Sequence, residues 1–180
     1  ISGSGDTLAI DYQFTNGGAG PVLVTNKIWR MVEGKAKIDP DFVYAHVNSD
    51  GLLAIYKTMP NIPEGKSPTN LVAPYMTKVE GGDRLSESIT LQLPLLPYQE
   101  YFNNEPAADS DGNKLVQTVK EVAFGLAFFV PPEGSKIWHE KAFGENVDLF
   151  HNPPGKRAQY GVLWSERFKV SVPVFRRTET

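Results

Sequence analysis

Three histidines and a few acidic residues are the side chains of this sequence best suited to acid–base or metal chemistry. The histidines are His46, His139 and His151, and the chain contains no cysteine. His139 and Glu140 begin like the helical zinc-protease motif, which needs a second histidine four residues after the first. Position 143 is Phe, so the motif is not completed. The lack of cysteine excludes disulfides, thiolate nucleophiles and Cys-ligated metals.

A hydrolase would need carboxylates or imidazoles that the fold brings into one cleft. The candidates for such a set are Asp39, Asp41, His46, His139, Glu140 and His151. Their spacing does not enforce proximity, so a fold-assembled hydrolase site and unrelated surface positions both stay open. A nucleophile elbow and a phosphate-binding glycine loop are both missing from the sequence. We therefore assign no catalytic residue and predict no cofactor.

One polar loop could bind calcium. Asp109, Asp111 and Asn113 surround Gly112, and hard cations prefer carboxylate and carbonyl oxygens around such a sharp turn. However, Ala107 occupies the place of the first ligand of an EF-hand loop. Position 118, where a bidentate Glu belongs, is Thr. The pattern fits a plain turn better, and a calcium-stabilised adhesion or carbohydrate-binding module stays an alternative hypothesis.

Aromatic and histidine side chains in two irregular segments form a candidate contact surface. Those segments are 97–113 and 131–158, and exposed aromatic side chains there could contact a protein or a carbohydrate. The same rings could instead close the ends of a β core. The candidate residues are Tyr98, Tyr101, Phe102, Trp138, His139 and His151.

Composition and charge exclude several classes of protein. The net charge is −3, and the only basic pairs are Lys156-Arg157 and Arg176-Arg177, which does not fit a nucleic-acid-binding face. No apolar run approaches about 18 residues, so we predict no transmembrane segment. The 16 Gly, 14 Pro and 11% aromatic residues favour strands and turns over long helices.

Apolar residues recur at every second position in several segments, which is typical of half-buried strands. We predict strands at 7–14, 21–29, 85–95, 115–130 and 160–174, the last with a bend near Trp164-Ser165. Asn48-Ser49-Asp50-Gly51 is a strong turn signal, so 42–57 is predicted to be a β-hairpin. Residues 31–41 look irregular.

The connections between these strands are long and rich in proline. Residues 58–75 contain four prolines, at 60, 63, 68 and 74, which excludes a helix or a central strand there. Residues 131–158 fit a strand, a short helix or a loop. We expect a flexible linker at 1–6 and one domain at 7–180. The predicted fold is an all-β, immunoglobulin-like antiparallel sandwich of two sheets and seven or eight strands.

The segment LAIDYQFTNGGAGPVLVTNKIW, from Leu8 to Trp29, resembles the opening hairpin of bacterial immunoglobulin-like modules. Small intracellular proteinase inhibitors of bacilli and periplasmic pilus chaperones are similar in that pattern. The resemblance implies the fold, and no functional residue of those families can be placed on this chain.

We expect a non-enzymatic binding or assembly module whose partner is another protein or a carbohydrate. Because the chain starts at Ile1 with a linker-like Ser-Gly segment, an N-terminal export or anchor segment could precede it. We therefore expect a periplasmic or extracellular protein of a bacterial cell envelope, and a cytoplasmic location stays open.

Overall fold

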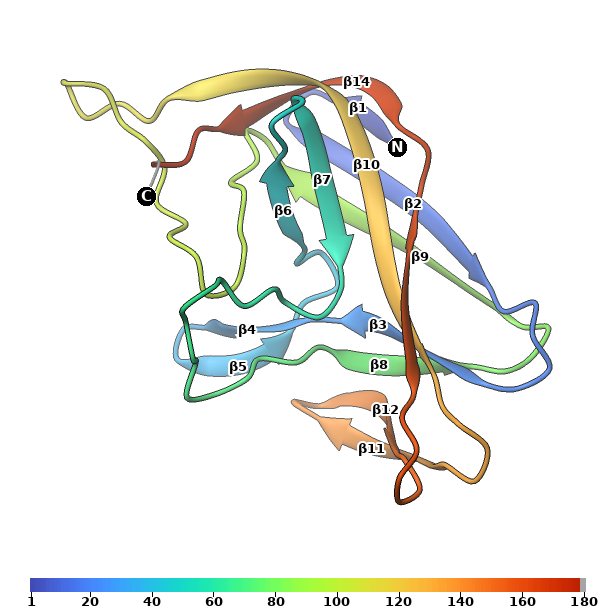
Figure 1. The fold of residues 1–180 in the computed structure, drawn as a ribbon. Coiled ribbons are helices and arrows are strands. Elements are labelled where there is room, and N and C mark those ends of the chain that lie inside the picture. The colour runs from blue at the N-terminus through green and yellow to red at the C-terminus, as the bar shows by residue number, and fades with distance from the viewer. Residues whose placement is uncertain (179–180) are drawn as a thin grey trace.

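The computed structural model describes residues 1–178, and every regular element among them is a β-strand. The strands form a small sheet, a large sheet and a separate two-stranded ribbon (Figure 1). No helix that could span a membrane occurs in this part of the chain. The all-β prediction is therefore confirmed.

The described chain contains fourteen strands: β1 (Ser2–Ser4), β2 (Thr7–Thr15), β3 (Val22–Lys27), β4 (Trp29–Val32), β5 (Lys35–Ile38), β6 (Tyr44–Val47), β7 (Leu52–Lys57), β8 (Tyr75–Val79), β9 (Arg84–Gln92), β10 (Val116–Val130), β11 (Lys136–Ala142), β12 (Glu145–His151), β13 (Gln159–Trp164) and β14 (Phe168–Phe175). The small sheet has the order β1-β2-β9. The large sheet has the order β11-β12-β8-β3-β10-β7-β6, with β13 and β14 also paired to β10. Strands β4 and β5 form the ribbon.

Strand β10 is the centre of the large sheet because it is the longest strand and pairs with four others. One edge pairs with β14 and then with β13. The other edge pairs with β7, in parallel, and with β3. In Figure 1 this strand arches across the whole molecule. Both edges of β10 are therefore used along its length.

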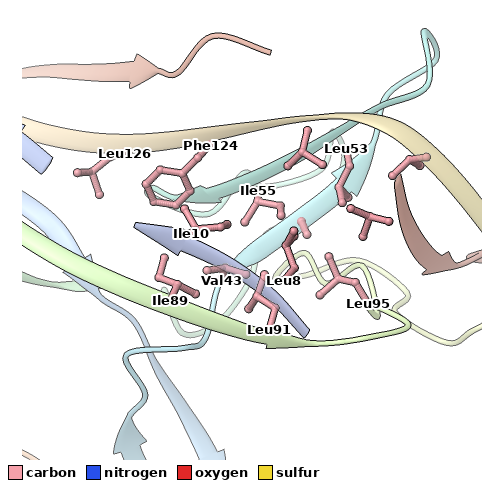
Figure 2. Close-up of a cluster of buried hydrophobic side chains, with 14 of the residues drawn as sticks. Leu8, Ile10, Val43, Leu53, Ile55, Ile89, Leu91, Leu95, Phe124 and Leu126 are labelled. Atoms are coloured by element: carbon pink, nitrogen blue, oxygen red, sulfur yellow. The ribbon is translucent and has the colours of Figure 1, made fainter. Parts of the chain in front are cut away.

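The main hydrophobic core lies between the small sheet and the inner face of the large one. Alternate residues of β2 and β9, such as Ile10 and Ile89, face Ile55 of β7 and Phe124 of β10 (Figure 2). Residues at every second position of a strand share a face, so the period of two in the sequence translates directly into this core.

The expected count of seven or eight strands is wrong, and two hairpins account for much of the difference. The β4–β5 and β11–β12 hairpins close on two-residue turns, Glu33-Gly34 and Phe143-Gly144, in which both residues have positive φ. Such turns are usually recognised by Asn or Asp at the first position. Glu and Phe at that position give no comparable sequence signal, so 31–41 and 131–158 looked irregular.

Other differences arise where one apolar pattern covers two strands. The predicted strand 21–29 divides into β3 and β4, and the predicted strand 160–174 divides into β13 and β14 around Ser165–Arg167. The bend expected near Trp164-Ser165 is thus present. No strand is predicted over β8, which starts at Tyr75 directly after the proline-rich connection. The predicted 42–57 hairpin is confirmed as β6–β7.

The start of the chain also differs from the expectation. Residues 2–4 were predicted within a flexible linker, but they form β1 and pair with β2. Gly5, with a φ of 57°, lets the chain reverse between the two strands, since glycine adopts positive φ at little cost.

Phe124 provides a test of this core. Its side chain is 5% exposed and contacts Tyr12 of β2 across the sheets. Phe124→Ala should lower the free energy of unfolding by about 3–5 kcal/mol, because it removes buried apolar surface and leaves a cavity. Phe124→Leu should cost less than half as much. Guanidinium denaturation measures both, and a loss below about 1 kcal/mol for Phe124→Ala would contradict this core.

Candidate functional site

The six residues considered for a hydrolase are spread over separate parts of the fold. Asp39 pairs with Arg30, and Asp41 accepts a hydrogen bond from the Thr90 amide at 2.8 Å. His46 lies on β6. Asp41 and His46 each line a hollow, but not the same one.

The other three hydrolase candidates lie on the β11–β12 hairpin. His139 and Glu140 are on β11, and His151 ends β12 opposite Lys136. All three are exposed, and His139 contacts the Asp148 carboxylate. The described residues therefore do not converge on one cleft, and the hydrolase hypothesis finds no geometric support.

The Asp109 loop has the geometry of a hydrogen-bonded turn. The Asp109 carboxylate accepts hydrogen bonds from the amides of Asp111 and Asn113, at 2.9 and 2.8 Å. It also accepts one from the Asn113 side-chain amide at 3.1 Å. These hydrogen bonds lower the pKa of Asp109. Among residues 1–178 no group of three metal-binding side chains comes together, so the turn interpretation is the one that this geometry supports.

Three of the predicted contact residues organise the loop that follows β9. The Tyr98 ring packs against Phe42 and stacks on Tyr44, and its backbone carbonyl accepts a hydrogen bond from Ala45 of β6. Tyr101 bonds to the connection after β7 through its hydroxyl, which accepts from the Val72 amide at 2.7 Å. Phe102 lies under the guanidinium of Arg177. These aromatic residues therefore hold the loop onto the outer face of the large sheet.

The remaining contact residues lie elsewhere. Trp138 and His139 on β11, and His151 on β12, belong to a hairpin whose strands share no hydrogen-bonded pairing with the loop around Tyr98. The predicted contact surface is thus two separate groups. A sequence pattern could not show this, because the pairing of β12 with β8 depends on a long-range contact.

An aromatic hollow of about 580 Å³ lies where that loop meets the β4–β5 ribbon. Trp29, Phe42 and Tyr98 supply its rings, and Arg30 and Glu100 supply charges at its wall. Burial, with help from Glu100, raises the pKa of Tyr98 to about 12. The hydroxyl therefore stays protonated and donates to Glu100 at 3.2 Å. The hollow combines flat apolar walls with a few polar groups, as small-ligand sites do.

A fully buried lysine ties the large sheet to the segment before β6. Lys57 is 1% exposed, and its ammonium group donates to the carbonyls of Asn26 and Pro40 at 3.1 and 2.7 Å. Burial lowers its pKa, an effect opposed by Glu87 and two aspartates. Because the ammonium group is committed to two carbonyls, Lys57 serves the fold rather than a reaction.

The free edge of strand β13 is a feature that sequence reasoning missed. It pairs only with β10, so its other edge has no strand partner among the described residues. The Ser165 amide donates to the Phe124 carbonyl at 2.8 Å. Since antiparallel hydrogen bonds alternate, the backbone groups of Tyr160, Val162 and Trp164 point away from β10 and toward solvent.

Large apolar side chains are exposed on both faces of β13. Tyr160 and Trp164 are 45% and 50% exposed on the outer face, and Leu163 is 55% exposed on the inner face. The strand contains no charged residue and no proline. Proteins usually protect a free edge with such residues, because an open edge is a template for pairing with another strand.

Two glycines shape this edge. A Cβ added to Gly125 would lie 2.8 Å from the Trp164 ring, and one added to Gly161 would lie 2.8 Å from the Phe128 ring. The Trp164 ring therefore covers Gly125 of β10 on the outer face, and the Phe128 ring covers Gly161 of β13 on the inner face. Both rings add apolar surface beside the free backbone edge.

A hollow of about 690 Å³ adjoins the inner face of β13. Leu163, Phe128, Val130 and Phe14 supply apolar walls, and the Gly17-Gly18-Ala19-Gly20 turn borders it. Leu163 is the residue of β13 that lines this hollow. The hollow therefore adjoins β13 on its inner face.

The opposite end of the large sheet shows how this protein protects an edge. Strand β11 is also outermost, but it carries Lys136, Glu140 and Lys141. Charges on an edge strand oppose pairing with another strand. Strand β6, at another outer position, is also uncharged, but its Ala45 amide donates to the Tyr98 carbonyl of the loop beside it. In the described part of the chain, β13 differs from β11 in having no charged residue and from β6 in having no such loop contact on its free edge.

Comparison with protein-family models, with curated proteins and with solved structures finds no match to this chain.

His46 gives a test of the geometry around β6. Burial, and then the charge of Arg177, lower the pKa of its imidazole, partly offset by a hydrogen bond with Asn48. The unfolded chain then binds the proton more readily, so stability is full above the ordinary value of 6.5 and falls as the pH drops below it. The slope cannot exceed about 1.4 kcal/mol per pH unit for one proton. Urea denaturation between about pH 7.5 and pH 5.5 should show this loss, and His46→Gln should reduce it.

The matched control is His151→Gln, because His151 is exposed at the end of β12. That variant should keep the pH dependence of the parent protein. An unchanged slope in His46→Gln would contradict the burial of the neutral imidazole.

Proposed function

We propose that this protein is a non-enzymatic binding module that takes up an extended segment of another polypeptide along β13. The observation that carries the proposal is the uncharged free edge of β13 next to an apolar hollow. Strand addition at such an edge uses backbone hydrogen bonds for affinity and side-chain pockets for specificity. Tyr160, Val162 and Trp164 would supply the hydrogen bonds, and the hollow would receive the partner's side chains.

The shape of the site specifies the chemistry of the partner. Successive side chains of an added strand point to opposite faces, so every second residue would face the hollow beside Leu163. Those residues should be apolar, and the segment should lack proline at the positions that donate to β13. The outer face would place the intervening residues next to Trp164 and Tyr160.

A second copy of this chain is a poorer occupant of the same site. In an antiparallel pair centred on Val162, the second β13 would present Gln159, Gly161 and Leu163 toward the hollow. Only one of these is a large apolar side chain. The hollow of about 690 Å³ favours a partner segment with several.

The immunoglobulin-like assignment and the location at a bacterial cell envelope are parts of this proposal. A small antiparallel sheet facing a larger one across an apolar core supports the first. The absence of cysteine and the binding character of the edge are compatible with the second. Fractionation of the full-length protein tests the location, and recovery from the cytoplasm would contradict it.

Amide hydrogen exchange can test strand addition residue by residue. The probe is a synthetic peptide of about ten residues in which valine and threonine alternate. Its addition should slow the exchange of the Tyr160, Val162 and Trp164 amides, because these face the free edge. The Gly161 and Leu163 amides bond to β10 already and should change little. Equal protection of all five, or of none, would contradict the proposal.

A proline variant tests the free edge without removing a hydrogen bond between β13 and β10. Val162→Pro removes an N–H that points to solvent, a position where an edge strand tolerates proline. Peptide affinity should fall by at least about fivefold, the value of one hydrogen bond. The matched control Val162→Ala keeps the N–H and should keep most of the affinity. If the same three amides become protected at high protein concentration without peptide, the second copy is the occupant and the partner proposed here is wrong.

A second candidate function is the binding of a small ring-containing ligand such as a carbohydrate in the aromatic hollow. Trp29, Phe42 and Tyr98 together with Arg30 and Glu100 favour it, since sugar rings stack on aromatic faces while their hydroxyls need polar partners. Simple sugars should shift the Trp29 and Tyr98 signals in NMR spectra. Trp29→Ala should abolish that shift while Trp138→Ala keeps it, and a titration without any shift would remove this candidate.

A further inference from the structure

A chain of hydrogen bonds joins four side chains from distant parts of the sequence at the β6 end of the large sheet. Arg177 donates to the Gln99 side-chain oxygen at 2.8 Å, and the Gln99 amide donates to the Tyr56 hydroxyl at 3.1 Å. That hydroxyl lies 3.2 Å from Nδ1 of His46. The Tyr98 loop, β6, β7 and the segment after β14 each contribute one member.

The Arg177 guanidinium is held in place by neutral groups. Its Nε and one terminal nitrogen donate to the Asn103 carbonyl, and its other terminal nitrogen donates to Gln99. The group also lies over the Phe102 ring. A guanidinium has five N–H donors, so one N–H on each terminal nitrogen is left over among these contacts.

No carboxylate in the described part of the chain pairs with this guanidinium. Burial lowers the pKa of Arg177, an effect opposed by the Tyr56 hydroxyl. The other described arginine ion pairs, at Arg30 and Arg167, all use aspartate or glutamate. The hydrogen bonds to neutral oxygens hold the half-buried guanidinium in place without neutralising its positive charge.

Three of these residues, His46, Gln99 and Arg177, also line a hollow of about 340 Å³. Its polar walls come from His46, Gln99, Gln117, Arg176 and Arg177, and no acidic residue lines it. Lys114 adds a further positive charge next to the hollow, where its ammonium group lies over the Phe175 ring. On a protein with a net charge of −3, this is a local concentration of cationic and amide donors.

We propose that this hollow binds a small oxyanion, a carboxylate or a phosphate group, on the two remaining Arg177 N–H groups. Arginine presents parallel donors that match both kinds of anion. The Gln117 amide and the His46 ring offer further hydrogen bonds, and Arg176 adds charge. The site is independent of the β13 edge, so the two proposals can fail separately.

His46 provides a direct readout of occupancy. The positive charge of Arg177 contributes to the lowered pKa of His46, and a bound anion would offset that charge. Arg177 and Tyr56 are the ionisable groups on neighbouring elements that contact or act on the ring, and Arg176 shares its hollow. Titration of the imidazole signals by NMR should therefore show the His46 pKa rising when the anion binds.

The experiment compares acetate and inorganic phosphate with chloride at equal ionic strength. Acetate or phosphate should raise the His46 pKa in a saturable manner, and the arm with the larger effect identifies the preferred group. The exposed His151 does not line this hollow and serves as the internal control. No saturable change of His46 in either arm would overturn the proposal.

Two substitutions assign the site to Arg177. Arg177→Gln should weaken binding of the preferred anion by at least about tenfold, because it removes the charge and the paired donors. Arg177→Lys keeps a charge but loses the fork, and should bind with intermediate affinity even if Arg177→Gln disturbs the loop. Arg157→Gln, at an exposed loop position, is the matched charge control and should bind like the parent. Equal affinity in all four proteins would overturn the assignment.

Discussion

The pairing of β10 with four other strands is the constraint on which the rest of the structure depends. Its inner face supplies Val122, Phe124 and Leu126 to the main core. Its two edges fix the positions of β14, β13, β7 and β3. Because both edges and one face are committed, a disturbance in β10 would reach both sheets. The apolar pattern on both faces of this strand reflects that central place.

The open edge at β13 follows from the same arrangement. On one side of β10, β14 pairs with the first half of the strand and β13 pairs with the second half. The chain bends between these two strands at Ser165–Arg167. Strand β14 continues toward β1 and Leu95, where its outer edge is partly covered. Among the described residues, β13 has no such neighbour on its outer edge. The apolar hollow lies between Leu163 of β13 and the turn at Gly17–Gly20.

The far end of the large sheet is closed differently. The loop after β9 carries Tyr98 onto the outer face, next to Tyr44 and Phe42. The chain then returns after β14 and inserts Arg177 between Phe102 and Gln99. Aromatic packing therefore holds this loop against the sheet, and the loop orients the Arg177 guanidinium. No single segment of the sequence reveals this arrangement, because Arg177 and the residues that it contacts are far apart in the chain.

The sequence by itself determined the all-β class, the strands with alternating apolar residues and the β6–β7 hairpin, because a period of two and an Asn-Ser-Asp-Gly turn are local properties of the chain. It also indicated that Asp109 and Asn113 lie in a turn. It did not reveal the hairpins closed by Glu33-Gly34 and Phe143-Gly144, since positive φ at Glu or Phe is imposed by the surrounding pairing. Which strand keeps a free edge, and which neutral groups fix the half-buried Arg177, were decided only by the tertiary structure, because both depend on contacts between residues far apart in the chain.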